Sequence, residues 1–362
     1  MKLTIKIKLL PSEKQKELLL QTMQKFNEAC NYISEICFEK RLYNKIAIHK
    51  IAYYDIRKQF NLSAQMAVRA IGKVVESYKI EKRKLHKFKK YSAMVLDDRI
   101  LTFKSLDTVS ILTLTGRELM SFVVGEYAKL SQKRVQGQAD LIYKKGKLYL
   151  CVVVDTPEET LQEVTKFLGI DLGICNIAVD SKGEFFSGNK ISEIKQRRNK
   201  HKASLQSKGT KSAKRRLKKV AGKIRDFVRD TNHCISKHIV EKAKALGYGI
   251  ALEELTKIKK TVRKSFRERF NSWSFYELRT FIEYKAQLAG IPVVCVDPRY
   301  TSQMCSHCGF ISKKNRKTQS DFVCQSCNFE ANADFNAAIN IAARAFVNKP
   351  IVTAHGVTSP LL

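Results

Sequence analysis

The chain has 362 residues, of which 44% are hydrophobic; this is enough apolar material for two or more packed domains and excludes a disordered chain. The 67 Lys and Arg exceed the 34 Asp and Glu, which leaves a formal net charge of +33. Self-repulsion of that size opposes compaction unless a polyanion is bound, so the composition predicts a nucleic-acid partner. An anionic membrane is the competing partner, but apolar runs such as 148–154 and 291–296 are too short to span a bilayer.

The N-terminus lacks a secretory pattern, because Lys2, Lys6 and Lys8 interrupt its apolar residues. A cytoplasmic location is therefore expected. In that reducing compartment, six cysteines in apolar stretches are predicted to be reduced core residues. These are Cys30, Cys37, Cys151, Cys175, Cys234 and Cys295.

The first elements are predicted from hydrophobic periodicity. Apolar and polar residues alternate over 2–9, as in a strand with one buried face. Ser12 and Gln15 then have capping-box spacing at the start of a helical pattern that runs to about residue 40. A second helical pattern covers about 63–90, and its end from 79 carries seven basic residues and one acid. This basic end suits a phosphate backbone, or is simply a solvated helix end.

Short alternating runs between about 93 and 155 indicate a small β-barrel or β-sandwich, completed by the N-terminal strand. The helical patterns would then form an insertion inside a β domain. A new segment begins near Phe167, with an apolar run that ends in Gly169-Ile170-Asp171-Leu172-Gly173.

The segment from Lys195 to Arg225 contains fourteen Lys or Arg and no acid, in a pattern that favours helix. It runs directly into the apolar helical pattern of 227–246, so we expect an ordered helical pair on the path of the nucleic acid. A second basic run, 257–269, lies among aromatic residues that could stack on bases, namely Phe266, Phe270, Trp273 and Phe275. Core packing is the simpler explanation for at least Trp273 and Phe275.

Four cysteines form two pairs, Cys305-x2-Cys308 and Cys324-x2-Cys327, with 15 residues between the pairs. Each pair supplies two thiolates from one tight turn, and two such turns complete a tetrahedral zinc site. Two disulfides are the alternative, but they would need an oxidising compartment. The spacing therefore predicts structural zinc.

Three acids stand where elements are predicted to begin or end. Asp171 and Glu253 each follow an apolar, strand-like run, and Asp334 begins a helical pattern whose N-terminal dipole favours an acid. Each alone could be an ordinary turn or helix-start residue. Together they could hold two Mg²⁺ ions for phosphodiester hydrolysis. The neighbouring Glu254 is expected to face solvent, and neither GxxxxGK[ST] nor GxGxxG occurs in the sequence.

The order of four motifs resembles the TnpB (OrfB) family of transposon-encoded, RNA-guided DNA endonucleases, which are relatives of the type V CRISPR effectors. The motifs are Gly169-Ile170-Asp171-Leu172-Gly173, Leu252-Glu253-Glu254-Leu255, Tyr300-Thr301-Ser302-Gln303-Met304-Cys305-Ser306-His307-Cys308-Gly309 and Asp334-Phe335-Asn336-Ala337-Ala338. They cover roughly the C-terminal 200 residues. The N-terminal half resembles the family only in its layout.

The resemblance implies a multidomain protein of the α+β and α/β classes. Asp171, Glu253 and Asp334 would be the Mg²⁺-binding catalytic acids of an RNase H-like RuvC domain, and the four cysteines would hold Zn²⁺ in a ribbon that binds the target nucleic acid. The implied domains are a wedge β-barrel (1–10 and 91–165), a helical recognition insertion (11–90), a RuvC-like domain (166–299, with a basic helical segment at 190–246), a zinc ribbon (300–330), a last RuvC segment (331–345) and a flexible tail (346–362).

The resemblance also implies a guide RNA from the transposon end. That RNA would select double- or single-stranded target DNA by base pairing, while the protein reads a short adjacent motif. The setting would be prokaryotic cytoplasm, with action at the nucleoid, and the oligomeric state stays open.

One departure from the family pattern concerns the last acid. Many members carry Asp-Arg-Asp before the Asn-Ala pair, whereas this chain has Asn332-Ala333-Asp334. The final acid is retained, so activity is expected. A guide-dependent, non-cleaving DNA-binding regulator and a strand-transfer transposase remain the alternatives.

Overall fold

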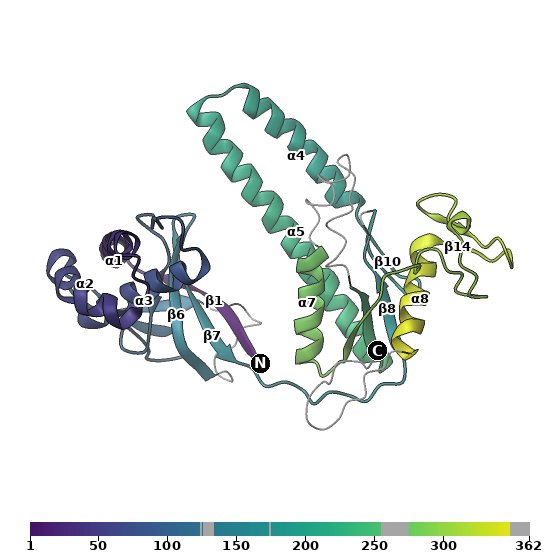
Figure 1. Cartoon of the computed structure of the whole chain (residues 1–362), viewed down its shortest axis with the longest axis horizontal. Helices are drawn as coiled ribbons and strands as arrows, with labels where there is room; N and C mark the ends of the chain where they lie inside the picture. Colours follow the sequence, from purple (N-terminus) through teal and green to yellow (C-terminus); the bar gives the residue numbers. More distant parts are fainter. Residues whose placement is uncertain (124, 126–133, 174, 255–274, 348–362) are drawn as a thin grey trace. The chain divides into compact units, whose positions relative to one another are not determined.

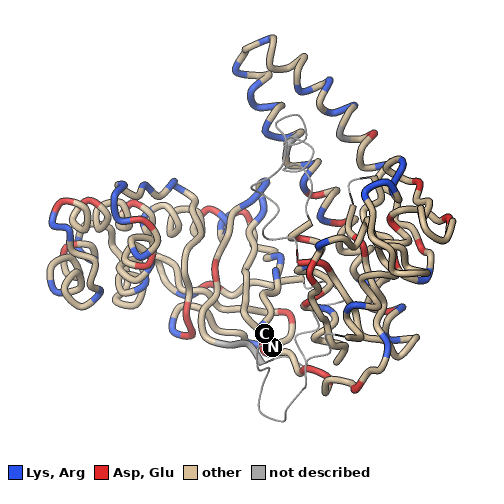
Figure 2. Tube along the Cα trace, turned by 45° about the vertical axis from the view of Figure 1, so that its right-hand side comes forward, with Lys and Arg blue, Asp and Glu red and all other residues tan. Residues whose placement is uncertain are grey.

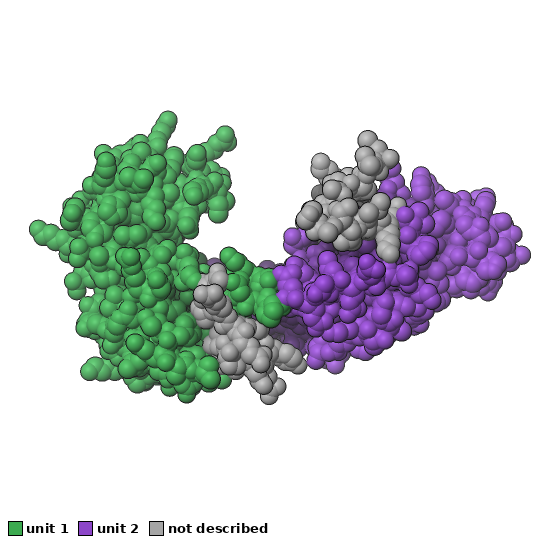
Figure 3. Space-filling view, turned by 90° about the horizontal axis from the view of Figure 1, so that it is seen from below, with its two compact units in different colours: residues 1–157 green, residues 158–362 purple. Residues whose placement is uncertain are grey.

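The computed structural model describes residues 1–123, 125, 134–173, 175–254 and 275–347 (Figure 1). The chain divides into two compact units, Met1–Pro157 and Glu158–Leu362 (Figure 3). Each unit has a hydrophobic core of its own. Among the described helices, none combines the length and the apolar character needed to cross a membrane.

The first unit contains a seven-stranded antiparallel sheet. Its strands are β1 (Lys2–Leu10), β2 (Met94–Leu96), β3 (Leu101–Phe103), β4 (Thr108–Thr113), β5 (Gly116–Val123), β6 (Arg134–Lys144) and β7 (Lys147–Asp155), in the order β2-β6-β7-β1-β5-β4-β3. The N-terminal segment forms a strand, as its alternation predicted, and this strand lies in the middle of the sheet. Ile5, Ile7 and Leu9 are buried, because successive strand residues point to opposite faces.

Three helices are inserted between β1 and β2: α1 (Glu13–Glu39), α2 (Lys45–Phe60) and α3 (Ala64–Ile80). The capping box predicted at Ser12 and Gln15 is present at the start of α1. The three helices share a core with the sheet, in which Met23, Ile56 and Ile71 are fully buried. The helix α2 was not predicted as a separate element, and α3 ends ten residues earlier than predicted.

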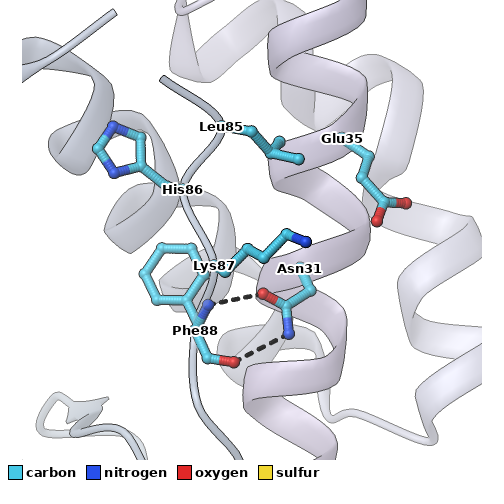
Figure 4. A pocket seen from close by; sticks show the side chains of 6 residues that line it. All are labelled: Asn31, Glu35, Leu85, His86, Lys87 and Phe88. Atoms are coloured by element: carbon cyan, nitrogen blue, oxygen red, sulfur yellow. Dashed lines mark hydrogen bonds between the residues drawn. The ribbon is translucent and has the colours of Figure 1, made fainter.

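The basic segment after α3 is irregular because side chains of α1 bind its backbone. Asn31 accepts a hydrogen bond from the Phe88 amide (2.7 Å) and donates one to the Phe88 carbonyl (3.0 Å) (Figure 4). The hydroxyl of the buried Ser34 donates to the His86 carbonyl (2.7 Å). These bonds replace the helical bonds that the sequence pattern predicted. Asn31, His86 and Phe88 border a pocket of about 300 Å³, together with Glu35, Leu85 and Lys87.

The second unit is built on a five-stranded sheet in the order β10-β9-β8-β11-β12. Its strands are β8 (Phe167–Asp171), β9 (Asn176–Asp180), β10 (Phe185–Ser187), β11 (Gly249–Glu253) and β12 (Val293–Val296). The strands β8, β11 and β12 are parallel, whereas β9 runs antiparallel to both of its neighbours. Parallel neighbours need crossover connections, and helices lie in both of them: α4 (Asn189–Ser207) and α5 (Lys211–Leu246) in the first, and α7 (Phe275–Leu288) in the second.

Helices cover both faces of this sheet (Figure 1). Ile170 and Leu252 face α5 and α7, in a core with Ile239 and Ile282. The opposite face packs against α8 (Ala333–Val347), whose last turn extends into the segment predicted as a tail. A small ribbon with strands β13 (Asp321–Val323) and β14 (Glu330–Asn332) and the 3-10 turn η4 (Lys313–Asn315) lies between β12 and α8 in the sequence.

The most basic stretch of the chain forms the predicted helical pair, α4 and α5. Thr210 caps α5 through a hydrogen bond from Ala213, after a short connection between the two helices. Figure 2 shows Lys and Arg recurring along both helices. The second basic run, 257–269, and Trp273 lie outside the described residues, as does the tail from 348.

The prediction of buried cysteines is correct only in part. Cys30 and Cys37 are buried and Cys151 is half-buried, but three others are exposed. The exposed three are Cys175, Cys234 and Cys295. Cys295 shows the reason: β12 is an edge strand, where an apolar sequence neighbourhood does not ensure cover on both faces.

Candidate functional site

Two of the predicted acids end neighbouring parallel strands. Asp171 is the last residue of β8 and Glu253 is the last residue of β11. Ile170 pairs with Leu252 across the two strands. The two acids are the next residue on each strand, so they occupy neighbouring positions at the same edge of the sheet. Their side chains point away from the Ile170 and Leu252 face, toward the face covered by α8.

The third acid, Asp334, is brought to this edge by close contact between α8 and β8. A Cβ atom at Gly169 would lie 2.1 Å from the Ala338 carbonyl oxygen and 2.5 Å from the Ala342 nitrogen. Only glycine therefore lets the helix backbone rest directly on the strand. Because Gly169 and Asp171 share one face of β8, the first turn of α8 lies near Asp171.

Polar contacts hold the Asp334 carboxylate, whose side chain is only 8% exposed. Asn176 Nδ2 donates to Oδ2 (3.0 Å), and Arg316 Nη2 donates to Oδ1 (3.1 Å). The side chain of Asn332 accepts from the Asp334 amide (3.0 Å), so it caps the start of α8. Asn332 thus has a structural role at the position where the family pattern places an acid.

The Asn332-Ala333-Asp334 departure is accommodated by packing. Ala333 is fully buried in the ribbon core with Phe322 and Cys324, a position where a basic side chain would lose its contact with water. The cation beside Asp334 comes instead from Arg316, which lies between η4 and β13.

Burial and the mutual repulsion of Asp171, Glu253 and Asp334 disfavour three ionised carboxylates without a bound cation. Burial, together with the charges of Glu253 and Asp334, raises the pKa of Asp171 to about 8, and the charge of Arg316 opposes this rise. Burial also raises the pKa of Glu253, against the hydrogen bond that Thr301 Oγ1 donates to it (2.5 Å). A divalent cation would relieve this repulsion, and hard carboxylate oxygens are the ligands that Mg²⁺ prefers.

The acids are less compactly grouped than the cysteines. Within the described part of the chain, the only group of three or more metal-binding side chains whose ligand atoms all lie within 4.8 Å is the cysteine quartet. The donor set at Asp171, Glu253 and Asp334 nevertheless fits hard cations in its chemistry.

The four predicted zinc ligands meet at one point. Cys305 Sγ lies 3.7 Å from Cys327 Sγ, and Cys308 Sγ lies 3.6 Å from Cys324 Sγ. Zinc bound to sulfur at about 2.3 Å in a tetrahedron separates its ligands by about 3.8 Å, so the cluster fits zinc in size and chemistry. Burial would raise the pKa of the Cys324 thiol, but the amides of Cys327 and Ser326 lower it to about 6, which favours a thiolate.

The expected exposure of Glu254 is correct only in part, because its side chain is 36% exposed and is also paired. Arg279 of α7 binds both of its carboxylate oxygens, Nη1 to Oε1 at 2.8 Å and Nη2 to Oε2 at 3.0 Å. This bidentate pair ties the end of β11 to α7. The sequence carried no signal for it, because the partner stands 25 residues away in the chain.

Three side chains that contact the acids were not predicted. Thr301 belongs to the family motif of residues 300–309, and this motif was the one sequence signal that could have indicated a functional role for its hydroxyl. Asn176 and Arg316 follow no local pattern, and only the tertiary contacts reveal them.

Two family models match this unit and the end of the first. The OrfB_IS605 model, described as "Probable transposase", matches residues 149–259. The "Cas12f1-like, TNB domain" model matches residues 275–341. The two matches include Asp171 and Glu253 in the first, and Asp334 with the cysteine quartet in the second.

Two curated relatives illustrate the sequence similarity. The CRISPR-associated endodeoxyribonuclease Cas12f1 of Sulfoacidibacillus thermotolerans is 32% identical over 260 residues, which cover 66% of this chain and 59% of the relative. TnpB-like protein MJ0751 of Methanocaldococcus jannaschii is 36% identical over 128 residues, which cover 34% of this chain and 45% of the relative. The chain thus spans less than two thirds of the length of either relative.

The fold is similar to that of solved Cas12 proteins. In the cryo-EM structure of the Cas12f1-sgRNA-target DNA complex, the similar chain has a TM-score of 0.63 at 16% identity. The similarity covers 91% of this chain and 83% of that one. The family models and the relatives confirm the resemblance to the TnpB (OrfB) family that the motifs predicted.

Proposed function

We propose that the chain is a transposon-encoded, RNA-guided DNA endonuclease that cleaves DNA beside a short target-adjacent motif. The observation that carries the proposal is the meeting of Asp171 and Glu253 at the ends of two parallel strands, on the face where α8 brings Asp334. The similarity to a curated endodeoxyribonuclease supports the same reaction class.

The three acids are proposed to hold two Mg²⁺ ions. When bound, such ions activate a water and stabilise the leaving 3′ oxygen of the phosphodiester. Asp171 and Glu253 offer oxygen ligands from the sheet, and Asp334 offers one from the helix. Asn176 and Arg316 orient the Asp334 carboxylate through their hydrogen bonds to it.

The domain roles follow from the same resemblance. We infer that the second unit is an RNase H-like RuvC domain with an inserted zinc ribbon, which the mixed sheet order β10-β9-β8-β11-β12 supports. The first unit would be the wedge domain with its helical recognition insertion, which the helices between β1 and β2 support. The boundaries given by the sequence motifs remain predictions.

The partners are proposed to be a guide RNA from the transposon end and its DNA target. The net charge of +33 is large enough to neutralise phosphates of both the RNA and the DNA. The α4–α5 pair offers an ordered surface with no acid between residues 194 and 225, which suits contact with a phosphate backbone. A prokaryotic cytoplasm, with action at the nucleoid, is the expected setting.

The test is cleavage by the full chain, purified with co-expressed transposon-end RNA. With Mg²⁺ and a matching target we expect free cut ends. Asp171→Asn should lower the rate by more than about 100-fold, because even residues behind metal ligands are worth about 10- to 100-fold. Asp55→Asn, on the exposed face of α2, is the matched control and should cleave normally. Cleavage that survives Asp171→Asn would refute the proposed centre.

A strand-transfer transposase is the second candidate, because the OrfB_IS605 model is described as a transposase. The same assay separates the two: joined donor and target ends would indicate transposition, and free ends would indicate hydrolysis. Guide-dependent binding that leaves both strands intact would instead indicate a regulator, a role against which the retention of all three acids weighs.

A further inference from the structure

We propose that the zinc ribbon positions the metal-binding acid Glu253 through a chain of buried hydrogen bonds, in which Thr301 is the positioning residue. The proposal rests on the proposed function, because it assigns a role in metal binding to Glu253. The ribbon would then have a second role: besides binding nucleic acid, it would orient Glu253 for metal binding.

The first link joins Thr301 to Glu253. Thr301 is 3% exposed. Its Oγ1 lies 2.5 Å from Glu253 Oε1 and 3.0 Å from the Pro298 carbonyl oxygen, so its one hydroxyl hydrogen is shared between these two acceptors. A buried, β-branched threonine whose hydroxyl also contacts a backbone carbonyl has little freedom to turn. It therefore limits the directions in which the Glu253 carboxylate can point.

The second link joins the Thr301 loop to α8. Asn340 Nδ2 donates to the carbonyls of Thr301 (2.9 Å) and Met304 (2.8 Å). Asn336 Nδ2 also donates to the Met304 carbonyl (2.8 Å). Both asparagines are buried, so the bonds are shielded from water and have few competitors.

The third link reaches the zinc ligands. The backbone amide of Ser306 donates to Asn336 Oδ1 (2.9 Å), and Ser306 stands between Cys305 and the second ligand of its pair. The loop before it contains Tyr300, which has a left-handed φ of 62° that a bulky residue rarely adopts. The surrounding bonds therefore determine the path of this loop, rather than its own conformational preference.

The helix α8 is connected to both Glu253 and Asp334. Asn336 and Asn340 lie on α8, whose first turn carries Asp334 and receives Arg316 from the ribbon. Zinc bound by the four cysteines would stabilise residues 301–306, and these would hold Glu253. Partners behind a metal ligand are typically worth about 10- to 100-fold in metal affinity.

The experiment measures Mn²⁺ binding to the full, zinc-loaded chain by electron paramagnetic resonance titration. Thr301→Val keeps the shape of the side chain and removes the hydroxyl, so we expect the Mn²⁺ dissociation constant to rise by about 10- to 100-fold. Thr301→Ser restores a hydroxyl and should recover most of the affinity. Thr318→Val, in the same ribbon with its hydroxyl on Asp321, is the matched control and should leave Mn²⁺ binding unchanged.

A second measurement does not depend on whether the variants fold. Zinc is removed from the wild-type chain with a chelator, the chelator is removed by buffer exchange, and Mn²⁺ binding is measured before and after zinc is restored. We expect a reversible loss of at least about tenfold in Mn²⁺ affinity. Equal affinity with and without zinc, or wild-type affinity in Thr301→Val, would overturn the proposal.

Glu253→Gln separates this proposal from the proposed function. If Glu253→Gln binds Mn²⁺ as tightly as the wild type, Glu253 is no metal ligand and the proposed centre fails. If Glu253→Gln loses Mn²⁺ but Thr301→Val and zinc removal do not, the centre stands and only the ribbon link fails.

Discussion

The two candidate metal centres of the second unit differ in how much of the chain each requires. The cysteine quartet lies within 23 consecutive residues, and each pair of ligands comes from one turn. The acids span residues 171 to 334, and they meet only because two strands pair in register and a helix rests on one of them. A local centre can be read from spacing, whereas a distributed one depends on tertiary packing.

Removing one zinc ligand should have the largest effect. Cys324→Ser replaces a thiolate by a poor zinc ligand, so bound zinc should fall from about one ion per chain to nearly none. Metal analysis of the purified protein measures this directly. We also expect impaired cleavage with all three acids intact, through loss of the ribbon fold or of substrate loading.

Cys234→Ser, at an exposed cysteine of α5, is the control and should retain zinc. Full cleavage by a zinc-free Cys324→Ser protein would show that the two centres are independent.

Changing one glycine should test how the distributed centre depends on packing. Gly169→Ala places a methyl group against the backbone of α8, and overpacking of this kind costs about 1–3 kcal/mol of unfolding free energy. Chemical denaturation measures the cost. The shift of α8 should also weaken metal binding at Asp334, although the acid itself is unchanged.

Gly222→Ala is the contrasting variant, because nothing lies within 4 Å of a Cβ atom at this position in α5. Alanine is the better helix former, so stability should rise by up to about 1 kcal/mol. A Gly169→Ala protein as stable as Gly222→Ala would contradict the close contact between α8 and β8.

The pH dependence of stability tests the buried Asp171 carboxyl. The pKa of Asp171 is raised from 3.8 to about 8, so between these values the folded chain binds a proton that the unfolded chain has released. Stability of the metal-free protein should therefore fall as pH rises from about 4 to 8. The fall should be smaller in Asp171→Asn, as measured by denaturation at several pH values.

Magnesium should reverse this trend, because cation binding requires the deprotonated carboxylate. Added Mg²⁺ should stabilise the wild type more at pH 8 than at pH 6. An identical pH profile in wild type and Asp171→Asn would show that Asp171 has an ordinary pKa, and that the acids do not repel one another.

Much of the fold could be predicted from local patterns. The alternation of β1, the capping box of α1 and the helical pair α4–α5 each depend on residues close together in sequence. Predictions went wrong, wholly or in part, where distant side chains competed with a local pattern. Asn31 and Ser34 hold residues 86–88 away from helix, and Arg279 pairs with Glu254.

The sequence by itself determined the four cysteines and the three acids as candidate metal ligands, and it determined the family resemblance, because thiolate spacing and motif order are properties of the linear chain. Only the tertiary structure decided which groups surround the acids. The strand register, the glycine contact with α8, and the approach of Arg316 and Thr301 join residues far apart in the chain. Such contacts are selected by the packing of the whole unit, and no local pattern encodes them.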